Sequence, residues 1–192
     1  MPGDLSAAFA AIDAANAQSP TGVEGRDAEL AVEWVHKLRR ADPPEALLLA
    51  ARAHHVRRWD KPRSTYPEGR AGYLRWKRDL QAHHAAVVAP LLRDAGYDDE
   101  TVERVQAIVR KQRLSSDPDV QTLEDALCIV FLQTQFSDLA ARLDGEKMVD
   151  ILRKSLAKMS DEGRAAALSL EPALSDAERA LLRAALERQP PA

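Results

Sequence analysis

The sequence predicts an all-α protein, a single compact domain of seven to nine helices over residues 1–192. Alanine, leucine, glutamate and arginine dominate the composition and β-branched runs are scarce, which favours helix over strand. Apolar side chains recur every three or four positions, and prolines, glycines and capping residues divide this pattern into segments of helical length.

Four helices are expected in the first half of the chain. Asp4 can cap the first helix, and Pro43 and Pro44 end the second and start the third, because proline is tolerated in a first turn. Pro90 removes one backbone donor inside the fourth helix, which ends at Gly96. A Pro- and Gly-containing loop precedes that helix. The expected helices cover about residues 5–17, 27–40, 44–59 and 70–95.

The second half is predicted to hold five further helices. The segment from Ala126 to Leu132 is apolar on nearly all sides, which is typical of a central helix. Ser175 and Glu178 form a capping-box pattern at the start of the last helix. The expected ranges are about 99–111, 121–143, 146–159, 161–168 and 175–187.

Composition limits the class of protein. Net charge is −3 over 192 residues, no apolar run is long enough to cross a bilayer, and the N-terminus lacks the basic region of a secretory signal. The single Cys128 lies in an apolar run and cannot form an intramolecular disulfide. We therefore expect a soluble cytoplasmic protein that does not enter a membrane, with frayed ends at residues 1–4 and 189–192.

Positive charge is concentrated between Arg52 and Arg78. This window holds nine Lys or Arg against two acids, although the chain as a whole is acidic. The adjacent His54 and His55 lie in it, as do four of the nine aromatic residues. Such a concentration marks a recognition surface or a site. The four aromatic residues are Trp59, Tyr66, Tyr73 and Trp76.

An anion-binding site is one interpretation of this window. Guanidinium groups bind phosphate and carboxylate bidentately, and Tyr or Trp rings can stack on a ligand. Arg58, Arg63 and Arg70 are the best candidates, because an aromatic residue or a proline close to each of them would fix the backbone. The alternative is that these arginines form ion pairs with the acidic remainder of the chain. An isoelectric point near 6 does not suit a dedicated nucleic-acid binder.

A metal site is a second interpretation. The order of five histidines followed by Asp125 resembles that of the HD-type metal phosphohydrolases, which are all-helical. The match departs at His55, where the pattern has Asp, and at Lys111, where it has a further His. A two-metal centre would lack its bridging carboxylate, which leaves one divalent ion at His55, His84 and Asp125, or histidines that bind no metal.

Glu124 and Asp125 begin an apolar helix, and two roles for them stay open. They can complement the helix dipole, or one of them can enter the interior and pair with Lys111, Arg58 or His55.

Several motifs together resemble an uncharacterised bacterial and fungal family, domain of unknown function 4202. They are RAHHVRRW, PRSTYP, GRAGYLRW, QTLEDALCIVFLQ and ILRKSLAKMS, and the resemblance covers about residues 5–186. Gln133 and Ser155 depart from the family pattern, which often has Glu and Thr there. The resemblance implies no reaction. The matching positions are His55, Arg58, Trp59, Pro62, Arg63, Tyr66, Pro67, Arg70, Gly72, Tyr73, Trp76, His84, Lys111, Gln121, Glu124, Asp125, Cys128 and Phe131.

The sequence thus predicts a pocket for a small phosphorylated or carboxylate metabolite. If the chain is an enzyme, we expect hydrolysis of a phosphoester; the alternative is a ligand-binding or interaction module with a structural ion-pair core. The candidate catalytic residues are His55, His84, Lys111 and Asp125. The candidate ligand-binding residues are Arg58, Trp59, Arg63, Tyr66, Arg70, Tyr73, Trp76, Gln121 and Glu124.

Overall fold

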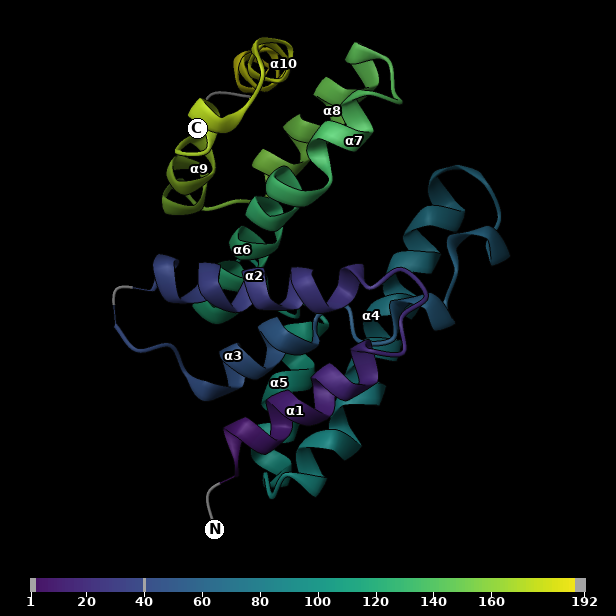
Figure 1. Cartoon of the computed structure of the whole chain (residues 1–192), viewed down its shortest axis with the longest axis vertical. Helices are drawn as coiled ribbons and strands as arrows, with labels where there is room; N and C mark the ends of the chain where they lie inside the picture. Colours follow the sequence, from purple (N-terminus) through teal and green to yellow (C-terminus); the bar gives the residue numbers. More distant parts are fainter. Residues whose placement is uncertain (1–2, 40, 189–192) are drawn as a thin grey trace. The chain divides into compact units, whose positions relative to one another are not determined.

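A computed structural model describes residues 3–39 and 41–188. These residues form ten α-helices and three short 3-10 helices and contain no strand, which confirms the all-α class (Figure 1). The helices are more numerous than the seven to nine expected. Contacts among them divide the chain into two compact units, Met1–Leu123 and Glu124–Ala192, called here the N-terminal and C-terminal units.

The N-terminal unit is built around α3. This helix packs against α1, α2 and α5, and α4 packs against α1 and α5 (Figure 1). Fully buried side chains, including Ile12, Leu47, Leu49 and Ile108, form its core. The elements are α1 (Leu5–Asn16), α2 (Val23–Leu38), α3 (Glu45–Ala53), η1 (Arg58–Asp60), η2 (Arg63–Thr65), α4 (Gly69–Asp94), α5 (Asp99–Val109) and the start of α6 (Pro118–Thr134).

In the C-terminal unit α8 packs against α7 and α10. Met148, Leu152 and Leu156 recur on one side of α8 and are buried. The predicted capping box at Ser175 and Glu178 is present at the start of α10. The elements after α6 are α7 (Phe136–Ala140), α8 (Gly145–Leu156), α9 (Asp161–Leu168), η3 (Glu171–Ala173) and α10 (Asp176–Glu187).

Two expected helices end earlier than the apolar pattern suggested. The third stops at Ala53, because the His54 ring bonds to the Ala51 carbonyl oxygen and Arg57 adopts a left-handed backbone with φ of 51°. The sixth breaks at Gln135, next to Thr134, whose hydroxyl donates to the Val130 carbonyl oxygen at 2.9 Å. Side-chain bonds of this kind compete with the backbone ladder at helix ends.

The helix α2 begins earlier than expected, at Val23 rather than near residue 27. Its first turn is held by the Glu24 carboxylate, which accepts hydrogen bonds from the hydroxyls of Ser19 and Thr21 at 2.5 and 3.2 Å. These contacts come from residues that the sequence assigns to a loop.

The predicted helix ends at Asp4, before α1, and at Gly96, after α4, are present. Asp4 accepts a bond from the Ala7 N–H at 2.9 Å, and its own N–H donates to the Ala95 carbonyl oxygen. Gly96 ends α4 with φ of 85°, and Pro90 lies inside α4 without ending it. Of the ends expected to fray, residues 1–2 and 189–192 lie outside the described residues. No helix within the described ranges has the length and apolar character that crossing a bilayer requires.

Candidate functional site

A loop over residues 61–68 is fastened to the start of α4. The indole Nε1 of Trp76 donates to the Lys61 carbonyl oxygen at 2.8 Å. A Cβ added at Gly72 would lie 1.9 Å from the Pro67 carbonyl oxygen, so glycine is required for this close approach. Gly72 and Trp76 of the GRAGYLRW motif therefore hold the loop in place.

Arg63 closes the same loop from inside. Its two Nη atoms donate to the carbonyl oxygens of Tyr66 and Pro67 at 3.0 and 2.9 Å. Burial, followed by the nearby Asp79 carboxylate, raises the pKa of Tyr66. The structure thus gives Arg63 a part in the conformation of the loop, while the ligand-binding roles of Arg63 and Tyr66 stay predictions.

Three histidine rings converge where α3 ends beside α4. The ring centroids of His54 and His55 are 4.0 Å apart, and those of His55 and His84 are 5.9 Å apart. The Nδ1 atoms of His54 and His84 each lie 2.7 Å from a backbone carbonyl oxygen, of Ala51 and Val56 respectively. Because a carbonyl can only accept, Nδ1 carries the proton in both rings and the neutral Nε2 keeps its lone pair.

These rings are uncharged at neutral pH. Burial lowers the pKa of His54 to about 3 and that of His84 to about 4. Burial also lowers the pKa of His55 well below its usual value, and the neighbouring His54 ring and Arg58 guanidinium act in the same direction. Lys111 adds to the effect at His54 and His55. The histidine cluster is therefore polar but uncharged, and the cations Arg58 and Lys111 act on it.

Arg58 is the cation that contacts the histidine cluster. Its Nη1 donates to Nε2 of His55 at 3.1 Å, and its guanidinium lies 5.3 Å from the centre of the Trp76 ring. The side chain is half-buried, and within residues 3–39 and 41–188 no carboxylate lies at ion-pair distance from it. Burial lowers the Arg58 pKa, and the charges of Glu24 and, more weakly, Asp27 oppose that effect without contact.

Lys111 occupies a backbone position that usually belongs to glycine. It follows the end of α5 with φ of 55°, and the next N–H, from Gln112, donates back to the Ala107 carbonyl oxygen at 3.0 Å. This is the Schellman arrangement, in which a left-handed residue ends the helix. A lysine there is strained by roughly 1 kcal/mol relative to glycine.

The other candidates in the N-terminal unit are more dispersed. Trp59 is half-buried in η1, and Arg70 is exposed in the first turn of α4. Tyr73 is 45% exposed, with its ring centroid 5.8 Å from that of Trp76. Gln121 of α6 lines a separate open cavity of about 280 Å³ with Leu114, Ser115, Ser116, Asp117 and Pro118.

Asp125 fixes the beginning of α9 in the C-terminal unit. It accepts bonds from the backbone N–H and the hydroxyl of Ser160 at 2.9 and 2.5 Å. A Cβ at Gly163 would lie 2.3 Å from the Asp125 carboxyl carbon. Glu124 pairs with Lys158 at 3.7 Å. The structure thus adds a role that the sequence did not suggest, while the predicted catalytic and metal roles of Asp125 stay predictions.

Within the described part of the chain, no three His, Cys, Asp or Glu side chains are arranged to hold a metal ion. The predicted set of His55, His84 and Asp125 gains no support from this geometry.

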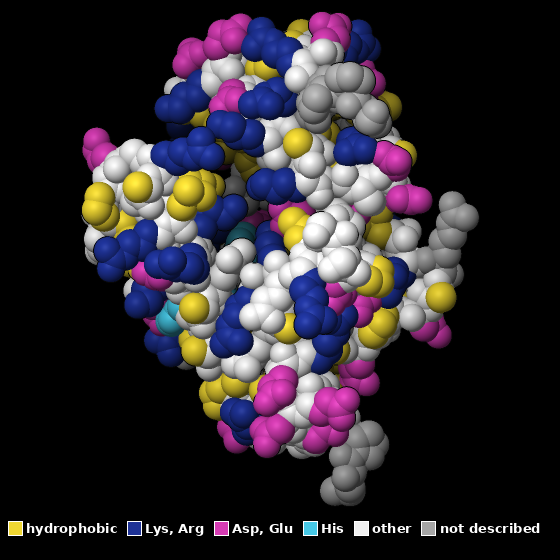
Figure 2. All heavy atoms as spheres, turned by 180° about the vertical axis from the view of Figure 1, so that it is seen from behind, with side chains coloured by type: hydrophobic (Ala, Val, Ile, Leu, Met, Phe, Trp, Pro, Cys, Tyr) yellow, Lys and Arg dark blue, Asp and Glu magenta, His cyan; other side chains and the backbone are white. Residues whose placement is uncertain are grey.

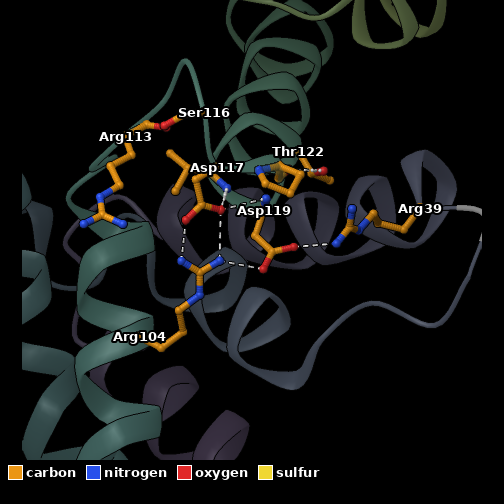
Figure 3. Close-up of polar contacts among 9 residues, drawn as sticks. Arg39, Arg104, Arg113, Ser116, Asp117, Asp119 and Thr122 are labelled. Atoms are coloured by element: carbon orange, nitrogen blue, oxygen red, sulfur yellow. Dashed lines mark hydrogen bonds and ion pairs between the residues drawn. The ribbon is translucent and has the colours of Figure 1, made fainter.

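The sequence did not reveal an ion-pair network that holds the start of α6 (Figure 3). Asp119 accepts from Arg39 at 2.5 Å and from Arg104 at 2.7 Å, and Arg104 also donates to Asp117 at 2.9 Å. The bond from Arg104 lowers the pKa of Asp117 to about 2. An Asp-Pro-Asp sequence before a helix is the signal that could have suggested it.

His54 is not among the candidate residues that the sequence indicates. Its adjacency to His55 on an apolar helix end was the available signal, and the structure places its ring within the buried cluster.

Comparison with known proteins gives the family. Residues 6–182 match the family described as "Domain of unknown function (DUF4202)". No curated protein and no solved structure matches the chain, so the expected likeness to the HD-type fold stays an expectation. The match spans most of the sequence, including the residues around Arg58, Trp76 and His84. The chain therefore belongs to the DUF4202 family.

Proposed function

We propose that the N-terminal unit binds a small anionic ligand through Arg58, beside the histidine cluster and Lys111. The ligand would present a phosphate or carboxylate group to the guanidinium. The observation that carries this proposal is that a half-buried guanidinium hydrogen-bonds to a neutral imidazole and has no described carboxylate at ion-pair distance. A partly desolvated charge of this kind gains most from a ligand of opposite charge.

The surroundings of Arg58 favour an anion over a cation. Arg58 and Lys111 both lower the pKa of His55, so two positive charges act on the cluster, while Glu24 and Asp27 act on Arg58 with the opposite sign and without contact. The stacked Trp76 ring and the hydrogen bond to His55 hold the guanidinium in one orientation before a ligand arrives. Preorganisation reduces the entropy lost on binding, so it favours a specific ligand over loosely held counterions.

Binding without turnover is favoured over phosphoester hydrolysis. An imidazole whose pKa is about 4, as at His84, is a weak base at neutral pH, and a general base works best when its pKa lies near the operating pH. The neutral rings serve better as hydrogen-bond acceptors that orient Arg58. Hydrolysis by this site therefore requires a ligand or ion that changes the protonation of the cluster.

A thermal-shift series tests the proposal. Purified protein is melted with inorganic phosphate, a nucleoside monophosphate, citrate or chloride at matched ionic strength. A ligand at a hundred times its Kd adds about 2.7 kcal/mol to the unfolding free energy, which is a clear rise in Tm. We expect phosphate or carboxylate ligands to stabilise the parent chain and not an Arg58→Ala variant.

The matched control is Arg93→Ala. Arg93 is an exposed residue near the end of α4 and pairs with Asp99 of α5. This variant should keep the full ligand-dependent shift. Equal shifts in the parent and in Arg58→Ala would refute the site. The parent chain could instead release phosphate from a phosphomonoester, with the activity lost in Arg58→Ala or His84→Asn. That result would replace the binding assignment with a hydrolase.

A further inference from the structure

One face of the first three turns of α4 is exposed, apolar at its centre and basic at both ends. Tyr73 and Leu74 are 45% and 53% exposed, and with Val23 they are the exposed large hydrophobic side chains of the described residues. Arg70 lies one turn before them and Lys77 one turn after, at the i, i+3, i+4, i+7 spacing of a single helix face. We call Arg70, Tyr73, Leu74 and Lys77, with the adjacent Arg78, the α4 ridge.

A neighbouring face of the same turns packs against the protein itself. Gly72 and Leu80 are buried, and Trp76 is half-buried and bonded to Lys61. This stripe at i, i+4, i+8 faces the loop and the core, and it lies about 100° around the helix from the centre of the α4 ridge. The loop over residues 61–68 is held against these turns by the Trp76 hydrogen bond to Lys61 and the close approach of Gly72 to Pro67.

The charge of the α4 ridge is incompletely balanced. Asp79 is shared between Arg75 and Arg78, at 3.9 and 3.7 Å, so one carboxylate meets two guanidinium groups. Arg70 is exposed and has neither a hydrogen bond nor an ion pair with any described residue. In the lobe at the left of Figure 2, dark-blue Lys and Arg side chains lie beside yellow apolar ones.

We propose that the α4 ridge is a docking site for an acidic segment of a partner protein that carries apolar side chains among its carboxylates. Two apolar side chains within a rim of cations match the anatomy of a protein interface, in which an apolar centre is surrounded by charge. Complementary charge supplies the attraction and Tyr73 with Leu74 supplies the desolvated contact. The ridge spans about 12 Å of helix, a small surface that suits a weak and transient interface.

The same features fit other polyanions less well. Lys77 lies 5.8 Å from the centre of the Tyr73 ring and occupies one of the two faces on which a nucleic-acid base would stack. Leu74 offers no hydrogen bond to a base or phosphate. Two apolar side chains are also too few to anchor a protein in a bilayer, because stable anchoring needs a second, larger signal.

Fluorescence anisotropy with the full chain tests this inference. The probe is a labelled peptide of about 16 residues in which glutamates alternate with leucine and phenylalanine. Its partner probe has the same charge, with serine in place of every apolar residue. We expect the apolar peptide to bind at least about fivefold more tightly than the serine peptide, the effect of one good apolar contact.

Substitutions then locate the contact on the protein. Leu74→Ser should weaken the apolar peptide about fivefold and Arg70→Glu about tenfold, whereas Arg93→Glu on the exposed end of the same helix should change little. All of these positions are exposed, so the fold is kept. Arg58→Ala should leave peptide binding intact, which separates this surface from the proposed anion site.

Three results would overturn the docking site. The first is equal affinity for the two peptides, which would indicate attraction by charge alone. The second is an equal loss in Arg93→Glu and Arg70→Glu. The third is tighter binding of a uridine oligonucleotide or of anionic phospholipid vesicles with the same loss in Leu74→Ser, which would assign the ridge to that polyanion instead.

Discussion

The Nη1 atom of Arg58 lies 3.1 Å from Nε2 of His55, so a charged guanidinium donates to a neutral ring where a carboxylate is the usual acceptor. The ring cannot neutralise the charge, and its own pKa is lowered by burial and by the charges around it. This hydrogen bond orients Arg58 but leaves its positive charge without a carboxylate partner. The arrangement distinguishes Arg58 from Arg39, Arg52 and Arg104, each of which contacts a carboxylate.

The histidine cluster should make stability depend on pH. The folded-state pKa values of His54 and His84, about 3 and about 4, lie below the ordinary value of 6.5. The unfolded chain therefore takes up protons first as pH falls below about 6.5, and the folded state loses stability until its own rings titrate. Each such ring contributes up to about 1.4 kcal/mol per pH unit. Urea unfolding at several pH values between 7 and 4.5 measures this slope.

His84→Asn is the variant matched to that measurement. Asparagine can still donate to the Val56 carbonyl oxygen but cannot be protonated, so the slope below pH 6.5 should become shallower. An identical slope in the parent and the variant would show that His84 is not the group responsible.

Two glycine substitutions should act in opposite directions. Gly163→Ala would place a methyl group 2.3 Å from the Asp125 carboxyl carbon, and we expect a loss of about 2–3 kcal/mol. Gly25→Ala in α2 meets no atom within 4 Å and should stabilise by about 0.5–1 kcal/mol. Chemical denaturation of the two variants checks both signs. A neutral Gly163→Ala would mean that Asp125 does not hold the start of α9 as described.

Lys111 allows backbone strain to be separated from side-chain function. Lys111→Gly and Lys111→Ala remove the same ammonium group, but only glycine relieves the left-handed φ of 55°. The glycine variant should therefore be more stable than the alanine variant by about 1 kcal/mol. Equal unfolding free energies would contradict the strained conformation. Both variants should bind the anionic ligand more weakly than the parent chain.

The network in Figure 3 should matter more than a surface ion pair. Asp119 is 8% exposed and contacts both Arg39 and Arg104, so Asp119→Ala leaves Arg39 without its carboxylate and Arg104 with Asp117 alone. We expect a loss of about 2–3 kcal/mol. Glu33→Ala breaks the exposed pair with Lys37 and should cost less than about 0.5 kcal/mol. Similar losses in the two variants would contradict the structural weight given to Asp119.

Much of the fold could be predicted because helix signals are local. The caps at Asp4, Gly96 and Ser175 and the length of α4 follow from residues close together in the sequence. The early end of α3 depends on a side-chain bond at His54, and the start of α2 depends on Glu24. Neither follows from apolar spacing, because a hydrogen bond to one backbone group changes the helix end without changing the pattern.

The residue types of the candidate site could be predicted from the sequence, but the contacts that each residue makes could not. Charge and aromatic density pointed to the segment that contains Arg58, and the family motifs added His84 from a distant part of the chain. Sequence could not show that Arg63 would bond to its own loop or that Asp125 would hold Ser160. Such assignments depend on which groups meet across tens of residues, and residue type alone leaves several partners open.

Isothermal titration of phosphate and citrate into the parent chain and the Arg58→Lys and Arg58→Gln variants tests the central claim most directly. Lysine keeps the charge without the bidentate fork, and glutamine keeps a neutral donor near His55. The predicted order of affinity is arginine, then lysine, then glutamine, with a loss of at least about tenfold at glutamine. Binding of equal strength in all three proteins, or no binding of either ligand to the parent chain, would contradict the proposed anion site at Arg58.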